Sequence, residues 1–508
     1  MAGGNALAID LGTTACKASV IAIDGAVLGS GLTRIPVEFG DHGAAEQDAE
    51  QVWQLTLDAC RAALAEAGAD AAASIVAVCV ASQWSSIVPV DGNGEAVAPL
   101  HMWFDRRGQA LADALVPDAA GEPALRWAEI HGFTPGTSLG HVLWFHTQPE
   151  IHDRTAAYLE PMDYLNARFT GVIAATANSA MPIGLTDNRR LGCAEWSAEL
   201  IERAGVDRSR LPELTRSLSV LAPIRADVAD SLGIPRGVDV VTGANDSIAG
   251  AFGAGALEAG RGAIMMGTTG VLTVHHAHRH VDPERFIVTM PSALDDRYYV
   301  VAEGGLGGKL IELALAEVFG GEAVDGGPAF DKLSAAAATS PPGSSGVLFL
   351  PWVFGSVSPA LDRRHRGALL GLSLSTSTGD VARAMLEGIS MQMRWLADEV
   401  EQAIGVEFGS IRFVGGGAQS DLWASIMADV LGRPIDQVAN PRHANARGAG
   451  FMAFVATGRL ALDELDSLVP VKATFEPRRE SANLYSERLG VVRDLHRVLA
   501  EPVSRLTN

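Results

Sequence analysis

Positive charge is scarce in this chain of 508 residues. Lysine and arginine together number 39 against 60 aspartate and glutamate residues, which gives a formal net charge of −21. Nucleic acids and anionic membranes both select basic surfaces, so neither is an expected partner. An acidic protein can still bind a phosphorylated ligand where Mg²⁺ and backbone N–H groups supply local positive potential.

Cysteine is also rare, and no two cysteines are close in the sequence. Cys16, Cys60, Cys79 and Cys193 form no C-x-x-C pair, so they give no zinc or redox motif, and reduced thiols are expected. The N-terminus lacks a basic segment followed by an apolar core, and no apolar run reaches the roughly 20 residues of a membrane helix. We therefore expect a soluble, cytoplasmic protein.

Aromatic residues make up only 6% of the chain, whereas glycine is abundant and spread along it, with 55 residues. This composition suits a turn-rich α/β protein rather than a disordered one. The length exceeds what one core accommodates and favours two large domains, expected at residues 1–247 and 248–508.

Periodicity and turn chemistry predict the elements that frame these domains. Residues 6–30 are typical of paired strands, and a helix is expected from Asp48. Further predictions are a buried strand over 74–82, a hairpin over 87–97, a strand over 99–105, a strand–turn–helix unit over 237–257 and a long helix over 377–403.

The triplet Gly-Thr-Thr occurs twice, each time between an apolar run and a β-prone run. The residues concerned are Asp10, Gly12, Thr13, Thr14 and Lys17 in the first stretch, and Gly267, Thr268 and Thr269 in the second. The N–H and hydroxyl groups of such a turn can bind phosphate oxygens, while the preceding carboxylate holds Mg²⁺ directly or through water. Either turn alone fits an ordinary hairpin, but the pair favours a bound nucleotide.

Asp246 lies where a buried strand gives way to a helix. It fits an N-cap, which accepts bonds from the first helical N–H groups. It equally fits a general base that takes a proton from a substrate hydroxyl during phosphoryl transfer. Position alone leaves both interpretations open.

Three consecutive glycines, residues 415–417, precede a helix that Ser420 is expected to cap and Gly432 to end. A tight turn needs one glycine. Three residues without Cβ atoms let the backbone approach a flat group such as adenine, although this triplet is also common in flexible turns.

A polar set over residues 83–105 could serve a polyol, which needs amides and carboxylates beside an apolar wall. Gln83, Trp103 and Asp105 each end an apolar run. The ordinary alternatives are a core position for Trp103 and a surface ion pair of Asp105 with Arg106 or Arg107. Glu46 and Asp48 can simply begin the next helix.

Taken in order, these stretches resemble the FGGY carbohydrate kinases, the group with xylulokinase, gluconokinase and glycerol kinase, and the layout is closest to xylulokinase-like members. The resemblance runs along nearly the whole chain. It rests on IDLGTTACK, AAEQDAEQVW, HMWFDRR, EPMDYLNARFTG, TGANDSIAGAFGAGAL, MGTTGVL and FVGGGAQSDLWASIMADVLGRP, of which the last three together are the most specific.

This resemblance implies an α/β, two-domain actin-like ATPase (ribonuclease H-like) fold, with mixed sheets flanked by helices and an interdomain cleft. It implies transfer of the ATP γ-phosphate to a hydroxyl of a small sugar, ketose or polyol. Carried over, Asp246 is the base, Asp10 holds Mg²⁺, and the two turns with Lys17 bind phosphate. Gly416, Gly417 and Ala418 line the nucleoside, and Gln83, Trp84, Trp103 and Asp105 face the sugar. A homodimer stays open, because the sequence does not fix the oligomeric state.

The acceptor side departs from the family pattern. Xylulokinases usually have Met-His where this chain has Trp84-Ser85, and glycerol kinases have Arg-Glu. The family's Gly-Glu-Arg-x-Pro is Gly-Ser-Val-Ser-Pro at residues 355–359, without either charge. The sequence therefore predicts ATP as the phosphate donor, but it does not predict which sugar accepts the phosphate.

An alternative function is a nucleotide-dependent switch or sensor on the same actin-like fold, without a small-molecule acceptor. Such a protein needs a client-binding domain or polymer contacts. The segment beyond about residue 460 is too short and too polar for a client domain, so the kinase is the favoured prediction.

Overall fold

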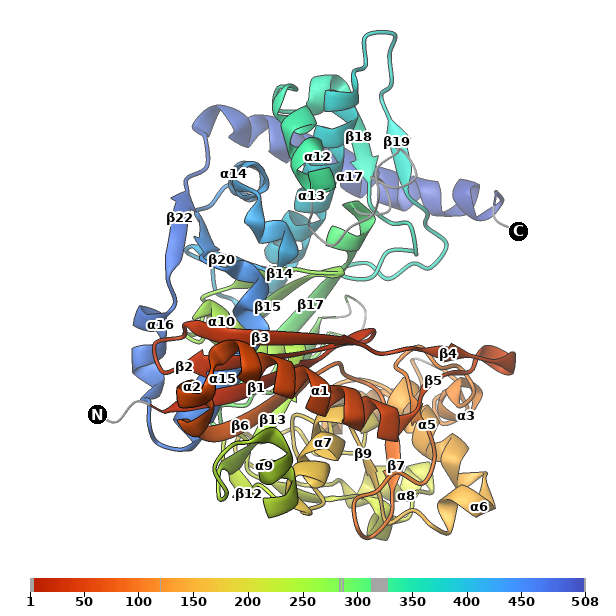
Figure 1. The fold of residues 1–508 in the computed structure, drawn as a ribbon. Coiled ribbons are helices and arrows are strands. Elements are labelled where there is room, and N and C mark those ends of the chain that lie inside the picture. Colours follow the sequence, from red (N-terminus) through yellow and green to blue (C-terminus); the bar gives the residue numbers. More distant parts are fainter. Residues whose placement is uncertain (1–3, 119, 283–284, 286, 312–327, 507–508) are drawn as a thin grey trace. The chain divides into compact units, whose positions relative to one another are not determined.

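The computed structural model describes residues 4–118, 120–282, 285, 287–311 and 328–506. The chain forms two compact units (Figure 1). Unit 1 comprises Met1–Gly253, Met290–Tyr298 and Asn445–Leu468, and unit 2 comprises Ala254–Thr289, Tyr299–Ala444 and Val469–Asn508. Each unit is thus assembled from segments that lie far apart in the sequence.

Unit 1 is built on a six-stranded mixed sheet in the order β12-β13-β6-β1-β2-β3. An antiparallel meander of β1, β2 and β3 continues into β6 and β13, which run parallel to β1. The bounds are β1 (Asn5–Leu11), β2 (Ala15–Ala22), β3 (Val27–Arg34), β6 (Ile75–Ser82), β12 (Val220–Pro223) and β13 (Asp239–Asn245). Apolar residues that alternate with small ones bury β1 and β6 almost completely.

Unit 2 repeats this arrangement in a seven-stranded sheet with the order β16-β17-β15-β14-β20-β21-β22. Here β14 and β15 form the antiparallel hairpin, and β20 and β21 run parallel to β14. The bounds are β14 (Ala263–Met266), β15 (Thr269–His276), β16 (Val288–Pro291), β17 (Tyr298–Leu306), β20 (Ile411–Val414), β21 (Ile435–Val438) and β22 (Val471–Phe475). In both sheets a Gly-Thr-Thr turn therefore follows the first strand.

Helix α1 (Ala49–Ala67) shows how the sequence sets the packing of unit 1. Asp48 caps it by accepting a hydrogen bond of 2.9 Å from Gln51 N. The helix packs against β2 and β3 (Figure 1). Gly31 of β3 permits this close approach, because a Cβ atom there would lie 2.1 Å from Ala59 O.

The other helices of unit 1 include α4 and α5, which enclose a separate apolar cluster around Trp127 and Phe145. Their bounds are α2 (Ala69–Ala73), α3 (Gln109–Asp113), α4 (Glu122–Ile130), α5 (Thr137–His146), α6 (Pro149–His152), α7 (Pro161–Thr170), α8 (Ala198–Ala204), α9 (Ala226–Leu232), α10 (Asp246–Ala254), α15 (Ala444–Ala456) and α16 (Leu465–Leu468).

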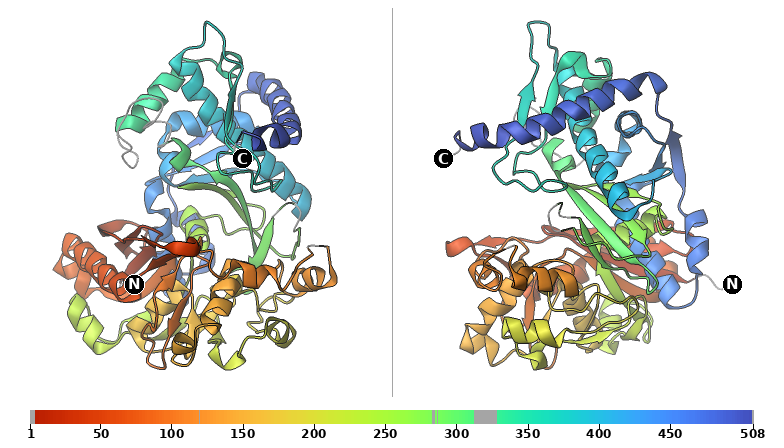
Figure 2. Two further views of the ribbon diagram at one scale, coloured as in Figure 1. Left: turned by 90° about the vertical axis from the view of Figure 1, so that its right-hand side faces the viewer. Right: turned by 180° about the vertical axis from the view of Figure 1, so that it is seen from behind.

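In the part of unit 2 that the structure describes, helices accompany the sheet. They are α12 (Pro328–Ala338), α13 (Thr378–Ile404), α14 (Asp421–Leu431) and α17 (Arg479–Ser504). A capping box between Ser377 and Asp380 begins α13, and Gly405 ends it in a left-handed conformation. Helix α17, in blue, lies beside α13 in the two further views as well (Figure 2).

Two of the expected elements differ in the structure. Residues 88–90 form β7, which pairs with β9 (Ala157–Leu159). The expected hairpin over 87–97 is present only as a short turn: an isolated bridge joins Val90 to Ala96, and Asp91 N and Val97 N donate to Glu95 O at 2.8 Å and to Pro89 O at 2.9 Å. The strand expected over 99–105 is reduced to β8 (Leu100–His101). The remaining strands are β4 (Glu38–Phe39), β5 (Ala45–Gln47), β10 (Ala174–Thr176), β11 (Glu213–Thr215), β18 (Leu348–Leu350) and β19 (Ala368–Leu370).

The four cysteines have free thiols, and Cys16, Cys60 and Cys79 are buried. Across the described residues, every helix is too short or too polar to cross a membrane.

Candidate active site

The ends of three neighbouring parallel strands bring the predicted site residues of unit 1 together. Leu11 of β1 and Asn245 of β13 both pair with Ser82 of β6. The residues that follow, Gly12, Gln83 and Asp246, therefore leave the same edge of the sheet, where α/β proteins bind ligands. Gln83 N donates a hydrogen bond of 2.6 Å to Leu11 O, which joins two of these strand ends.

The first Gly-Thr-Thr turn is closed by a hydrogen bond from Gly12 N to Ala15 O of 2.9 Å. Asp10 pairs with Lys17 across the hairpin. Burial raises the pKa of Asp10 above its ordinary value, while Lys17 and the side chain of Asn445 favour the charged form. The Lys17 side chain is exposed, so this turn combines a shielded carboxylate with an accessible cation.

The second turn follows β14 and is one residue shorter, since Met266 pairs with Gly270. Gly267 N donates to Thr269 O at 3.0 Å. The backbone of Gly307 and Gly308 supports the turn by donating to Thr268 O at 3.0 Å and to Gly267 O at 2.8 Å. Thr268 is exposed, so the outer side of the turn is accessible.

Asp246 is the first residue of α10, and its side chain is exposed. The neighbouring Asn245 supplies the cap, because its Oδ1 accepts hydrogen bonds of 2.8 Å from Ile248 N and from Ser247 Oγ. The N-cap interpretation of Asp246 is therefore wrong: the residue before it performs that role.

The three glycines after β20 differ in how much space a side chain would have at each position. Gly415 has φ +91°, and a Cβ atom there would lie 2.6 Å from Met266 O. A Cβ atom at Gly417 would lie 2.6 Å from Met266 Cγ and 2.7 Å from Trp423 Cζ3, whereas one at Gly416 would meet nothing within 4 Å. Packing thus explains Gly415 and Gly417, while Gly416 faces open space. Ala418 is fully buried.

Asp105 is not part of a surface ion pair, because its side chain is fully buried. Its carboxylate accepts a hydrogen bond of 2.8 Å from Ala45 N and several from Arg107, which also contacts Glu46 at 2.6 Å. Burial opposes ionisation, but these hydrogen bonds keep the pKa of Asp105 below its usual value. The group is thus a fixed anion that holds Arg107 and strand β5 in place.

Trp103 is 48% exposed and is not a core residue. Its Nε1 donates to Thr13 Oγ1 at 3.2 Å, so it lies beside the first turn. Gln83 is buried, and its Nε2 contacts Met102 Sδ at 3.8 Å. Gln83 Oε1 and Trp84 Nε1 have no hydrogen-bond partner among the described residues, so both can bind a ligand or water.

His101, Asp105 and His141 form a buried group that the sequence patterns did not reveal. Their ligand atoms lie within 4.8 Å of one another, the arrangement that a metal ion requires. Burial lowers the pKa of His101 to about 2 and that of His141 to about 4, so both rings are neutral. However, the Arg107 guanidinium already neutralises Asp105, and a second cation would compete with it. We therefore assign no metal to this group.

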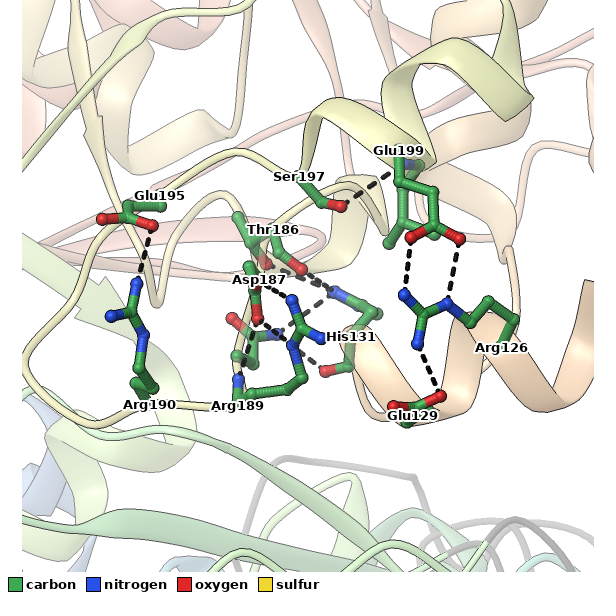
Figure 3. Close-up of polar contacts among 12 residues, drawn as sticks. Arg126, Glu129, His131, Thr186, Asp187, Arg189, Arg190, Glu195, Ser197 and Glu199 are labelled. Atoms are coloured by element: carbon green, nitrogen blue, oxygen red, sulfur yellow. Dashed lines mark hydrogen bonds and ion pairs between the residues drawn. The ribbon is translucent and has the colours of Figure 1, made fainter.

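A second polar group in unit 1 lies around the segment 184–199 (Figure 3). Arg126 pairs with Glu129 and Glu199 at 2.7 Å, and Arg190 pairs with Glu195 at 3.1 Å. These side chains are largely exposed, and such ion pairs contribute only about 0–1 kcal/mol each. The group attaches the segment to α4 and α8 and carries no feature of an active site.

Two family domains match this chain in sequence. The N-terminal domain of the FGGY family of carbohydrate kinases matches residues 5–253, and the C-terminal domain matches residues 262–457. The chain is 28% identical to the xylulose kinase of Escherichia coli (strain K12), covering 95% of this chain and 99% of that protein. It is 22% identical to the gluconokinase of Bacillus subtilis (strain 168), covering 99% and 97%.

Solved structures share the fold over nearly the full length. A ligand-bound xylulose kinase from Lactobacillus acidophilus superposes with a TM-score of 0.86 at 21% identity, covering 99% of each chain. A xylulose kinase from Rhodospirillum rubrum gives 0.83 at 25% identity, also covering 99% of each chain. The two-domain, actin-like ATPase fold expected from the sequence is thereby confirmed.

Proposed function

Because the chain belongs to the FGGY family of carbohydrate kinases, we propose that it transfers the γ-phosphate of ATP to a hydroxyl of a small ketose or polyol, with xylulose as the first acceptor to test. The observation that carries this proposal is the common sheet edge from which Gly12, Gln83 and Asp246 emerge. Family membership also favours a kinase over a nucleotide-dependent switch.

In the proposed reaction, Asp246 accepts the proton of the acceptor hydroxyl as that oxygen attacks the γ-phosphorus. The new bond joins the acceptor oxygen to phosphorus, and the bond between this phosphorus and the β,γ-bridging oxygen breaks, releasing ADP. The exposure of Asp246 at the start of α10, beside the cap supplied by Asn245, supports this role.

On the donor side, we propose that both Gly-Thr-Thr turns and Lys17 bind phosphate oxygens of ATP, and that Gly416 and Gly417 approach the nucleoside. Mg²⁺ fits Asp10, because a carboxylate oxygen suits this hard cation and a bound cation stabilises a carboxylate whose pKa is raised by burial. When bound, Mg²⁺ neutralises phosphate charge.

The proposal is tested by following ADP formation with pentuloses, polyols, tetritols and aldonates as acceptors. We expect one class to give saturable, acceptor-dependent turnover. If pure, folded protein phosphorylates none of them, the proposed function fails.

The glycines at 416 and 417 give a matched pair of variants. Gly416→Leu is expected to raise the KM for ATP about 10- to 100-fold with little change in Tm, because its side chain enters open space beside the proposed nucleoside position. Gly417→Ala is expected to lower the free energy of unfolding by about 1–3 kcal/mol, since its Cβ meets Met266 and Trp423. Steady-state kinetics and thermal unfolding check both. An unchanged KM for ATP in Gly416→Leu would contradict the nucleoside assignment.

A further inference from the structure

The side-chain amide of Gln47 is buried beside the first Gly-Thr-Thr turn and donates to it. Gln47 is the last residue of β5 and is 1% exposed. Its Nε2 donates to Thr13 O at 2.9 Å and to Pro36 O at 3.3 Å. Both acceptors are backbone carbonyl oxygens, so only the NH₂ end of the amide can face them. One side chain thus joins the middle of the turn to the segment that follows β3.

This contact sets the direction of a backbone N–H group in the turn. The peptide bond between Thr13 and Thr14 is trans, so its C=O and N–H groups point in opposite directions. Because Thr13 O faces Gln47, the Thr14 N–H faces away from it. Thr14 is exposed, and its N–H donates to no acceptor in the part of the chain that the structure describes. Gln47 therefore holds an N–H group in a direction where an anion can reach it.

Two further contacts hold the same two residues of the turn. Ile35 N donates to Thr14 O at 2.9 Å, and Trp103 Nε1 donates to Thr13 Oγ1 at 3.2 Å. The second contact uses a lone pair of the hydroxyl group and leaves its proton to donate elsewhere. Both carbonyl oxygens are therefore bonded to the protein, whereas an N–H and an O–H donor remain for a ligand.

Gln47 is itself held firmly. Strand β5 lies between β4 and β8 in a three-stranded sheet. Ala45 N donates to Asp105 Oδ2 at 2.8 Å, and Glu46 contacts Arg107 at 2.6 Å. A side chain on a strand that is fixed at neighbouring residues is a rigid support for a binding site.

The hairpin does not need Gln47 in order to form. Strands β1 and β2 pair continuously from Asn5 with Ala22 to Leu11 with Cys16, and Gly12 N closes the turn by donating to Ala15 O. The contacts from Gln47, Ile35 and Trp103 act beyond this ladder, on the two threonines that the ladder leaves unpaired. Their convergence there indicates a role in orienting the turn.

We propose that Gln47 is a positioning residue for phosphoryl transfer, because it fixes the turn so that Thr14 N–H and Thr13 O–H donate to phosphate oxygens of ATP. This inference rests on the proposed kinase function and adds a residue outside the turn to the phosphate-binding part of that site. Donors that are oriented before the reaction need no reorganisation as charge develops on the transferred group. Gln47 acts through Thr13 and does not itself contact the nucleotide.

The first test compares the full-length wild type with Gln47→Met, which removes the donor and keeps the length of the side chain. We expect kcat/KM for ATP to fall about 10- to 100-fold and the Kd for ATP to rise. The Kd for adenosine should stay unchanged, because adenosine carries no phosphate. Steady-state kinetics and calorimetric titration measure these effects. A general loss of structure would instead weaken the binding of both compounds.

Gln47→Glu gives a readout that simple filling of space would not produce. Only a neutral carboxyl group has an O–H that can donate to Thr13 O, and the ionised form places a negative oxygen against that carbonyl. Its kcat/KM for ATP, relative to wild type at the same pH, should therefore fall as the pH rises. The same ratio for Gln47→Met should show no such dependence. A ratio for Gln47→Glu that does not change with pH would overturn the inference.

Asn5→Leu is the control, because it removes another amide-to-carbonyl hydrogen bond, from Asn5 Nδ2 to Ala71 O at 3.1 Å, at the opposite end of β1. It should keep the ATP kinetics of wild type, and Tm values identify folding defects in every variant. If Gln47→Met does not fold, the pH profile of Gln47→Glu decides.

Two results separate this inference from the proposed function. Unchanged ATP kinetics in folded Gln47→Met, or equal losses of affinity for ATP and adenosine, would overturn the role of Gln47 while the kinase function stands. A wild type that phosphorylates no acceptor would overturn the proposed function, whereas the two affinities would still show whether Gln47 acts on phosphate binding.

Discussion

Replacing Asp246 with asparagine is expected to lower kcat about 100- to 10,000-fold, the usual contribution of a general base. The amide cannot take the proton of the acceptor hydroxyl, whereas the cap supplied by Asn245 keeps the start of α10 intact. The KM for ATP and the affinity for ATP should change little. A coupled ADP assay with the preferred acceptor measures the first effect, and calorimetric titration with ATP measures the second.

The matched control is Asp239→Asn, at the opposite end of the same strand, β13. This variant removes a carboxylate from the strand without touching its carboxyl end, so it should keep full activity. If Asp246→Asn also kept full activity, Asp246 would not be the base. If it lost ATP binding together with turnover, its role would lie in nucleotide binding.

Replacing Glu387 with leucine is expected to lower the free energy of unfolding by about 3–5 kcal/mol, the usual cost of leaving the partner charge buried. The side chains of Glu387 and Arg383 are 0% and 5% exposed, and they contact each other at 2.7 Å. Glu387 also accepts hydrogen bonds from Tyr485 Oη at 2.6 Å and Ser344 Oγ at 2.9 Å. Urea unfolding followed by hydrogen exchange within α13 measures the loss.

Two comparisons make this prediction specific. Glu501→Ala breaks the exposed pair between Glu501, in the last turn of α17, and Arg505, which follows the helix, and should cost less than about 1 kcal/mol. Combining Glu387→Leu with Arg383→Met should recover much of the lost stability, because no charge then remains buried. A double variant as unstable as Glu387→Leu would show that the lost hydrogen bonds, rather than the unpaired cation, dominate.

The sequence predicted the elements whose causes are local. Alternating apolar residues and the turn chemistry of Asp24-Gly25 predict β1, β2 and β3, and the caps Asp48 and Ser420 mark the helices that they begin. It did not predict the return of Asn445–Leu468 to unit 1, because long-range packing leaves no periodic pattern. For the same reason it did not predict that β9 pairs with β7.

Two things limited the prediction of individual site residues. Neighbouring residues of similar chemistry can fill the same role, and the sequence does not show which side chains are buried. Asn245 and Asp246 are both good capping residues, and only the hydrogen bond from Ile248 N to Asn245 Oδ1 shows that Asn245 caps the helix. Asp105 has the pattern of a surface pair with a neighbouring arginine, yet strand β5 covers it.

Lys17 offers a direct way to observe the donor side, because unit 1 contains no other lysine. Amine-reactive reagents therefore modify the side chains of this unit at a single position, next to the first Gly-Thr-Thr turn. The mass of the peptide that contains Lys17 then shows whether a bound ligand protects that turn from modification, without a radiolabel or an engineered probe.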